Sequence, residues 1–130
     1  YLAKEKADVV IVDMADKIAL TEKYNSGHER LRELYYRLRE AAKTYDCAVL
    51  GLSQASAEAE GKTRITMSMM EGSKLGKAAE SDIMLGLGKM DNPDDPDDST
   101  RWITVMKNKI SGWHGTVMVN LDVDRNRYVA

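Results

Sequence analysis

The stretch DVVIVDM, residues 8–14, decides the fold, because it has the composition of a buried parallel strand. The run is continuous, rich in Val and Ile, and closed by an acid. A strand with one solvated face would instead alternate apolar and polar residues. We therefore expect residues 8–14 to lie inside a parallel sheet and to be buried on both faces.

A helix and a second apolar strand follow this run. Ser26 and Glu29 stand three residues apart in the pattern of a capping box, which marks the start of a helix. Apolar residues then recur at steps of three and four and form one stripe along the helix. Residues 47–54, CAVLGLSQ, are a second continuous apolar run that ends in polar groups. Strand, helix and strand in this order predict a βαβ unit.

The second half of the chain has the pattern of an antiparallel meander. Residues 82–88 form another apolar strand, and three turn-linked strands follow at 101–109, 116–124 and 127–130. Between them we expect an exposed mobile loop over residues 55–68 and a solvent-exposed acidic loop over residues 89–99. The fold class is therefore α/β, one domain spanning residues 1–130 with a mixed sheet, in which a parallel βαβ core precedes the meander.

Composition limits the classes of function. The net charge is −2, so any contact with nucleic acid depends on a local patch of the surface. A single cysteine, Cys47, rules out an internal disulfide. No apolar run approaches the ~20 residues of a membrane-spanning helix, so we expect no membrane partner. The chain starts at Tyr1 rather than at a methionine, and we expect it to be part of a longer protein.

Two parallel strands end in polar side chains, at the edge where open α/β sheets bind ligands. Asp13 follows four apolar residues, the pattern of a Walker B strand whose carboxylate orients a magnesium-bound water beside a nucleotide. An ordinary strand end has the same pattern, so both interpretations stay open. Gln54 ends the next strand, where its neutral amide can donate to a terminal phosphate.

The phosphate loop that such a nucleotide site requires is not found in the sequence. Its pattern is G-x-x-x-x-G-K-[ST], and residues 72–78, GSKLGKA, resemble it superficially. Only three residues separate these two glycines, and Ala78 stands where the magnesium-binding hydroxyl belongs. The segment also follows the Walker B strand instead of preceding it. We therefore do not interpret residues 72–78 as a phosphate loop.

Two pairs of basic residues each allow two interpretations. Lys107 and Lys109 stand two residues apart at the end of a strand, so their side chains are expected on the same side. They fit either a solvated strand end or two positive charges directed at a ligand. Lys62 and Arg64 are the only basic residues of the loop 55–68, and they fit either a solvated loop or contact with a phosphate backbone.

The order of these features resembles the C-terminal half of the RecA-like ATPase domain of DnaB-type replicative helicases, the phage members especially. Five segments carry the resemblance, and together they cover nearly the whole chain. They are VVIVDMAD at 9–16, the helix that begins at Ser26, VLGLSQAS at 49–56, EGSKLGKAAESDIMLGL at 71–87 and ITVMKNKISGWHGTVMVNLDVDRNRYVA at 103–130. Each segment is a loose match alone, but five in the same order are specific.

The resemblance implies a hexameric ring that binds ATP and Mg²⁺ between subunits and translocates on single-stranded DNA. It also implies a place in the cytoplasm of a bacterium or of a phage-infected host. By the same resemblance, Asp13 is the Walker B acid and the metal ligand. Gln54 matches the residue that senses the γ-phosphate and couples it to DNA.

The resemblance assigns roles to the basic residues as well. Lys107 matches the lysine that reaches the γ-phosphate bound to a neighbouring subunit. Lys109 stands where the family usually has an arginine finger, and a lysine there keeps the charge but loses the bidentate fork. The loop after Gln54 matches a loop that faces DNA, and Lys62 and Arg64 are its basic residues.

The family's phosphate loop and catalytic glutamate precede the Walker B strand, outside these residues, so we expect the chain alone not to hydrolyse ATP. In such folds the phosphate-loop strand lies between the strands expected at 47–54 and 82–88. An isolated chain should therefore either pair these two strands directly or cover their edges by self-association. Two alternatives stay open: a RadA- or KaiC-like ATPase, and a non-catalytic RecA-like module that binds DNA or a ring partner.

Overall fold

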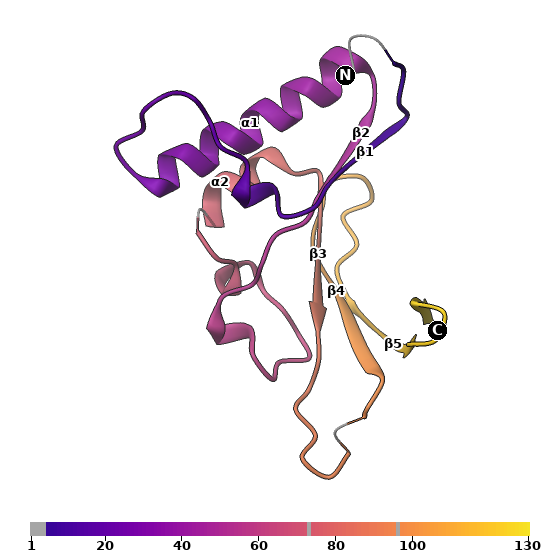
Figure 1. Ribbon diagram of the computed structural model, residues 1–130. Coiled ribbons are helices and arrows are strands. Elements are labelled where there is room, and N and C mark those ends of the chain that lie inside the picture. The colour runs from indigo at the N-terminus through magenta and orange to yellow at the C-terminus, as the bar shows by residue number, and fades with distance from the viewer. Residues whose placement is uncertain (1–4, 73, 96) are drawn as a thin grey trace. The chain divides into compact units, whose positions relative to one another are not determined.

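The computed structural model of the chain describes residues 5–72, 74–95 and 97–130 (Figure 1). These residues form two compact units, and each is described by itself. The first unit comprises residues 5–54 and Met70–Ser81, and the second comprises Ala55–Met69 and Asp82–Ala130. Tyr1 and Ser73 lie outside the described residues.

The first unit contains the predicted βαβ arrangement. Strand β1 (Val9–Val12) pairs in parallel with β2 (Ala48–Gly51), and helix α1 (Gly27–Tyr45) connects the two strands. A one-turn helix, η1 (Ala15–Lys17), follows β1 directly, and helix α2 (Lys74–Glu80) belongs to the same unit. The βαβ prediction is therefore confirmed.

Helix α1 begins where the capping pattern predicts, with one difference in its hydrogen bonds. Ser26 is the N-cap, and its Oγ accepts a hydrogen bond from the backbone N of Glu29 at 3.1 Å. The carboxylate of Glu29 accepts from the backbone N of Asn25 at 3.0 Å, one residue earlier than in a regular capping box. Leu31 and Leu34 are the buried residues of the apolar stripe.

The parallel strands are less covered than the sequence predicts. Val10 and Val12 are half-buried, but Val9, Ile11 and Leu50 are exposed, Ile11 by 66%. The prediction that residues 8–14 are buried on both faces is thus wrong for this chain. The physical reason is that the sheet has only two strands, and Val9 and Ile11, which share one of its faces, stay exposed.

The second unit is an antiparallel meander, as predicted. Strands β3 (Ile83–Gly88), β4 (Thr100–Asn108), β5 (Thr116–Asp122) and β6 (Arg127–Val129) pair in chain order. Figure 1 shows β3 and β4 running side by side. The segment Ala55–Met69 belongs to this unit and contains two one-turn helices, η2 (Ala57–Ala59) and η3 (Met67–Met69).

The parallel and antiparallel strands form two sheets instead of the one mixed sheet that the sequence predicts. Strands β1 and β2 make one sheet, and β3 to β6 make the other. Within the described part of the chain, β2 pairs only with β1, and β3 pairs only with β4. Direct pairing of β2 with β3, one of the two outcomes expected for an isolated chain, is therefore not found.

Self-association, the second outcome, remains a prediction. Both sheets leave apolar side chains in water, among them Ile11 in β1 and Leu85 in β3, which is 59% exposed. Exposed apolar faces and unpaired strand edges favour association. Analytical ultracentrifugation of the 130-residue chain at about 100 µM should show species larger than the 14.5 kDa monomer. Ile11→Lys with Leu85→Lys should reduce their share, and a monodisperse monomer of the unaltered chain would contradict the prediction.

Candidate functional site

The carboxyl ends of β1 and β2 bring two sequence-predicted site residues to the same edge of the first unit. The two strands are paired to their last residues. Beyond the ladder, the backbone N of Leu52 donates to Val12 O, and the backbone N of Ala15 donates to Leu52 O, both at 2.9 Å. Asp13 and Gln54 therefore follow neighbouring strands on one sheet edge, and both are exposed.

The backbone turns sharply after Asp13. Met14 has φ 56° and ψ 56°, in the left-handed region that residues other than glycine rarely adopt. Such a conformation costs about 1–3 kcal/mol and persists only where the surroundings fix it. Here the next residue, Ala15, is fully buried. Because strained backbone clusters at functional sites, Met14 supports a site at this strand end.

A buried lysine binds the residues that follow both strands. Lys77, in α2, is 1% exposed, and its Nζ donates to three oxygens: Asp16 Oδ2 at 2.6 Å, Ser53 Oγ at 2.7 Å and Glu71 O at 2.8 Å. Each N–H of the ammonium group therefore has an acceptor. Ser53 Oγ donates to Asp16 Oδ2 at 2.7 Å, which closes a triangle of three side chains.

Tyr35, from α1, adds a fourth side chain. Its hydroxyl donates to Asp16 Oδ1 at 2.8 Å, and its ring centroid lies 5.6 Å from Lys77 Nζ, within the range of a cation–π interaction. Burial, together with the Asp16 carboxylate, raises the pKa of Tyr35, so the hydroxyl stays a donor at neutral pH. We call Asp16, Tyr35, Ser53 and Lys77 the lysine cluster.

The ionisation of Asp16 makes the stability of the lysine cluster depend on pH. Burial raises the pKa of Asp16, but hydrogen bonds from Lys77, Ser53 and Tyr35 lower it by more, so its pKa lies below the ordinary value. The unfolded chain then binds this proton more readily than the folded chain, so stability rises with pH in this window. The contribution is present above the unfolded-state pKa of about 3.9 and is lost as pH falls through the lower folded-state pKa.

We predict that Asp16→Asn destabilises the chain at neutral pH, and that the difference from the unaltered chain shrinks below about pH 4. The reason is that the carboxylate of the unaltered chain becomes protonated there and no longer differs in charge from the amide. Urea unfolding followed at several pH values between about 2 and 6 measures this. A destabilisation that stayed constant over this range would contradict the lowered pKa of Asp16.

In the second unit, an apolar anchor holds the segment that carries Lys62 and Arg64. Ile65 is buried, whereas Lys62 and Arg64 are exposed. A Cβ added to Gly86 would lie 2.5 Å from Ile65 Cβ, and one added to Gly88 would lie 2.4 Å from Lys62 O. Only glycine permits this close approach. The expected loop is therefore packed along β3, with its two basic side chains in solvent.

Lys107 lies near the end of β4, beside a β-bulge. It is opposite Met84, but the next pair of the ladder joins Leu85 to Val105, so Met106 is the extra residue. A bulge changes the direction of the side chains that adjoin it, and bulges are frequent next to active sites. The sequence around Met106 contains no glycine that would have predicted this feature.

Lys109 lies just beyond β4 and contacts its own chain. Its backbone N donates to Asp82 O at 2.9 Å, and its Nζ is 3.5 Å from Asp82 Oδ1. Both side chains of this ion pair are largely exposed, so the pair contributes only about 0–1 kcal/mol. Because this ion pair is weak, Lys109 can leave Asp82 and bind another anion at little cost in free energy.

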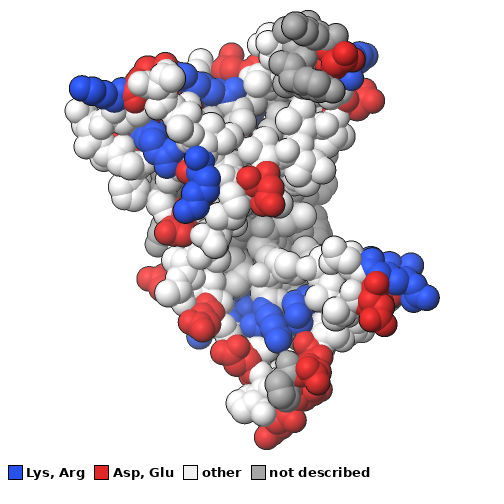
Figure 2. Space-filling model, in the orientation of Figure 1, with Lys and Arg blue, Asp and Glu red and all other residues white. Residues whose placement is uncertain are grey.

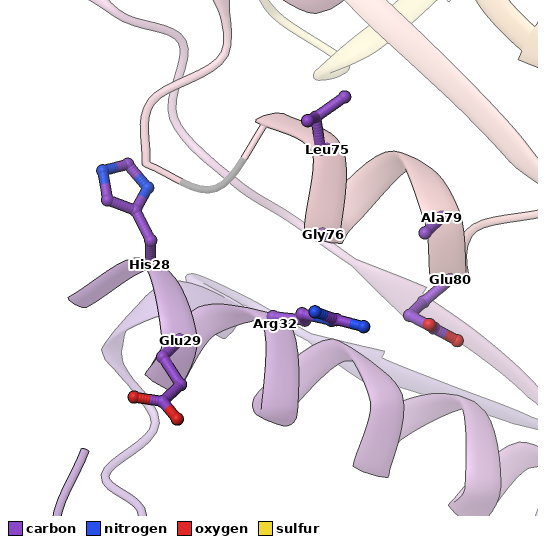
Figure 3. A pocket seen from close by; sticks show the side chains of 7 residues that line it. All are labelled: His28, Glu29, Arg32, Leu75, Gly76, Ala79 and Glu80. Carbon is purple, nitrogen blue, oxygen red and sulfur yellow. The ribbon is translucent and has the colours of Figure 1, made fainter. Parts of the chain in front are cut away.

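A shallow groove between α1 and α2 is a less suitable site. Figure 3 shows that Arg32 extends across it toward Glu80, while Leu75 points away from α1. Ligand sites are enclosed and mostly apolar, with a few polar groups that converge. This groove is open rather than enclosed, and none of the site residues described above borders it.

Residues 5–72, 74–95 and 97–130 contain no group of three His, Cys, Asp or Glu side chains that could hold a metal ion. A single carboxylate such as Asp13 still fits Mg²⁺, which nucleotide sites hold by one or two carboxylates together with water and phosphates.

No helix described is long and apolar enough to cross a membrane. Figure 2 shows acidic and basic side chains intermixed on the face in view.

The lysine cluster was not predicted from the sequence. Lys77 lies in the segment 72–78, whose sequence suggests only a defective phosphate loop, and Asp16 lies 61 positions away from it. The available signal was a pair of polar residues, Asp16 and Ser53, within four residues of the ends of two apolar strands. Strand ends in a parallel sheet share an edge, so these residues were candidates for one cluster.

Comparison with solved structures gives two likenesses in fold. The chain superposes on a structure described as an ATPase domain with a TM-score of 0.76 and 21% identity, over 93% of this chain and 43% of that one. It superposes on a DnaB-like replicative helicase, solved for its interactions with primase, with a TM-score of 0.74 and 20% identity, over 93% of this chain and 30% of that one. The chain thus spans less than half of either structure.

No protein-family model matches the chain, and no curated protein matches it by sequence. The likeness therefore rests on structure, and at this level of identity it concerns the fold. It confirms the predicted resemblance to DnaB-type helicase ATPase domains at the level of architecture.

Proposed function

We propose that the chain is the C-terminal half of a RecA-like ATPase domain, the motor of a ring-shaped replicative DNA helicase that uses ATP and Mg²⁺. The observation that carries this proposal is the position of Asp13 and Gln54 on neighbouring parallel strands at one sheet edge, in a chain whose fold resembles helicase ATPase domains. The protein would act in the cytoplasm of a bacterium or of a phage-infected host.

In this proposal, the two residues of the strand edge act on the nucleotide. Asp13 would orient a water bound to Mg²⁺, and the phosphates of the nucleotide would supply most of the other ligands of the metal. Gln54 donates its amide to the γ-phosphate and so registers whether that phosphate is present. The exposure of both side chains supports these roles, because the ligand must reach them from solvent.

The basic residues of the second unit act on phosphates outside their own subunit. Lys107 reaches the γ-phosphate bound to a neighbouring subunit of a hexameric ring, and Lys109 supports it in the position of an arginine finger. Lys62 and Arg64 contact the backbone of single-stranded DNA. Their exposure beside a buried Ile65 supports this role, because the anchor holds two cations in solvent.

The test of the proposed function needs the longer protein, that is, this chain together with the segment that supplies a phosphate loop. That protein should hydrolyse ATP, single-stranded DNA should stimulate the rate, and a forked DNA should be unwound. The 130-residue chain by itself should be inactive. Absence of hydrolysis by the longer protein would point to a non-catalytic module, and hydrolysis without unwinding would favour a RadA- or KaiC-like ATPase.

Gln54→Ala separates the sensor role from general damage to the protein. If Gln54 couples the γ-phosphate to DNA, the variant should keep a basal rate of ATP hydrolysis but lose most of its stimulation by single-stranded DNA. A loss of about 5–150-fold corresponds to the usual coupling free energy between two sites. Stimulation equal to that of the unaltered protein would refute the sensor role.

A further inference from the structure

The lysine cluster joins segments that are distant in sequence but meet at the strand edge. Lys77 donates to one acceptor in η1 (Asp16), to one two residues after β2 (Ser53) and to one on the backbone before α2 (Glu71 O). Lys77 is 1% exposed and Asp16 17%, so the charges interact where water screens them little. A polar network of this kind is stable only while each member keeps its partners.

The same contacts tie together the two ends of the segment 55–69, which carries Lys62 and Arg64. The residue before this segment is Gln54, and its carbonyl oxygen accepts a hydrogen bond from the backbone N of Glu71 at 3.4 Å. Glu71 O in turn accepts from Lys77. Ser53, directly before Gln54, accepts from the same lysine.

We propose that Lys77 is a positioning residue that binds the Ser53–Gln54 turn and the backbone of Glu71 into one unit, so that a movement of Gln54 is transmitted to both ends of the segment 55–69. This inference rests on the proposed function, because it gives the sensor Gln54 a mechanical connection to the basic segment. Neither Lys77 nor Ser53 contacts nucleotide or DNA in this role.

The chemistry of Ser53 explains how the connection works. Its hydroxyl accepts a hydrogen bond from Lys77 and donates one to Asp16, so it acts as both acceptor and donor within the cluster. A displacement of the Gln54 backbone moves Ser53 as well, because the two residues share one peptide bond. The displacement then removes an acceptor from a buried ammonium group, which is unfavourable unless Lys77 and Glu71 follow.

Ser53→Ala and Tyr35→Phe form a matched pair for testing this. Each removes one hydroxyl that donates to Asp16, and each leaves the Lys77–Asp16 ion pair in place. Only the Ser53 hydroxyl also accepts from Lys77 and lies next to Gln54. Both variants should fold, and their melting temperatures measure the structural part of the change.

In the longer protein, Ser53→Ala should lower the stimulation of ATP hydrolysis by single-stranded DNA about tenfold, while Tyr35→Phe should leave it within about twofold. Ser53→Thr keeps the hydroxyl and should keep the stimulation. Equal stimulation in the Ser53→Ala and Tyr35→Phe variants would overturn the positioning role and leave the proposed function intact. An unaltered protein without stimulated hydrolysis would overturn the proposed function itself, and the transmission role with it.

A second measurement uses the 130-residue chain and needs no activity. Amide hydrogen exchange followed by NMR reports how often the bond between Glu71 N and Gln54 O opens. Exchange at Glu71 should rise about tenfold in Ser53→Ala and stay within about twofold in Tyr35→Phe. Equal exchange rates in the two variants would show that Lys77 does not hold Glu71 through the Ser53 turn, and would overturn the inference.

Discussion

Replacing Lys107 with alanine in the longer protein is expected to lower the rate of ATP hydrolysis by about 10³-fold and to leave nucleotide affinity nearly unchanged. The physical reason is that a cation supplied by a neighbouring subunit stabilises charge that develops on the phosphate only in the transition state. An interaction made only there changes the catalytic rate and not the binding of the ground state. Single-turnover hydrolysis and equilibrium binding of a fluorescent nucleotide measure the two quantities separately.

Lys109→Ala is the matched control, because Lys109 is two residues away and has the same charge. A lysine in the position of an arginine finger keeps the charge but lacks the bidentate fork that suits a phosphate. We therefore expect a smaller loss of hydrolysis than for Lys107→Ala. If nucleotide binding were lost in Lys107→Ala, the residue would have a different role. If Lys109→Ala caused the larger loss, the two assignments would have to be exchanged.

The elements of the fold were predictable because their signals are local. The apolar run before Asp13, the cap at Ser26 and the next apolar run each indicate an element within one short window of sequence. The order of those elements then defines the βαβ unit, and turn residues define the meander. The structure agrees on these points.

The burial of the strands was not predictable, because it depends on what lies beside them. Val9 and Ile11 have the composition of residues covered on both faces, yet both are exposed in a two-stranded sheet. The composition of a strand indicates whether its faces favour burial. It does not indicate whether the same chain contains the strands and helices that would bury them. The same reason explains why two sheets form instead of one.

The site was predictable only in part. Asp13 and Gln54 could be located because strand ends are a local feature, and the structure agrees that the two strands pair. The functions of Asp13, Gln54, Lys62, Arg64, Lys107 and Lys109 remain predictions. The lysine cluster depends on a contact between residues 61 positions apart, and no periodic pattern records such a contact.

Lys77→Met is expected to reduce the free energy of unfolding of the 130-residue chain by about 3–5 kcal/mol. The substitution keeps the length of the side chain but leaves the Asp16 carboxylate, 17% exposed, without its cationic partner. That loss is a large part of the total stability of an ordinary domain, about 5–15 kcal/mol. Urea unfolding followed by circular dichroism at a wavelength sensitive to helix reports on the first unit, which contains α1.

The double variant Lys77→Met with Asp16→Leu distinguishes a lost charge pair from lost packing. Replacing both partners of a buried ion pair by apolar groups is often neutral, whereas removing one partner is costly. The double variant should therefore recover part of the stability, less the contribution of the Tyr35 and Ser53 hydroxyls, which lose Asp16 as their acceptor. The deficit of Lys77→Met should also shrink below about pH 4, where protonation removes the unpaired charge of Asp16. Two results together would contradict a role for the charge: a double variant no more stable than Lys77→Met, and a loss of stability in Lys77→Met that does not depend on pH. Lys77 would then stabilise α2 through the packing of its side chain.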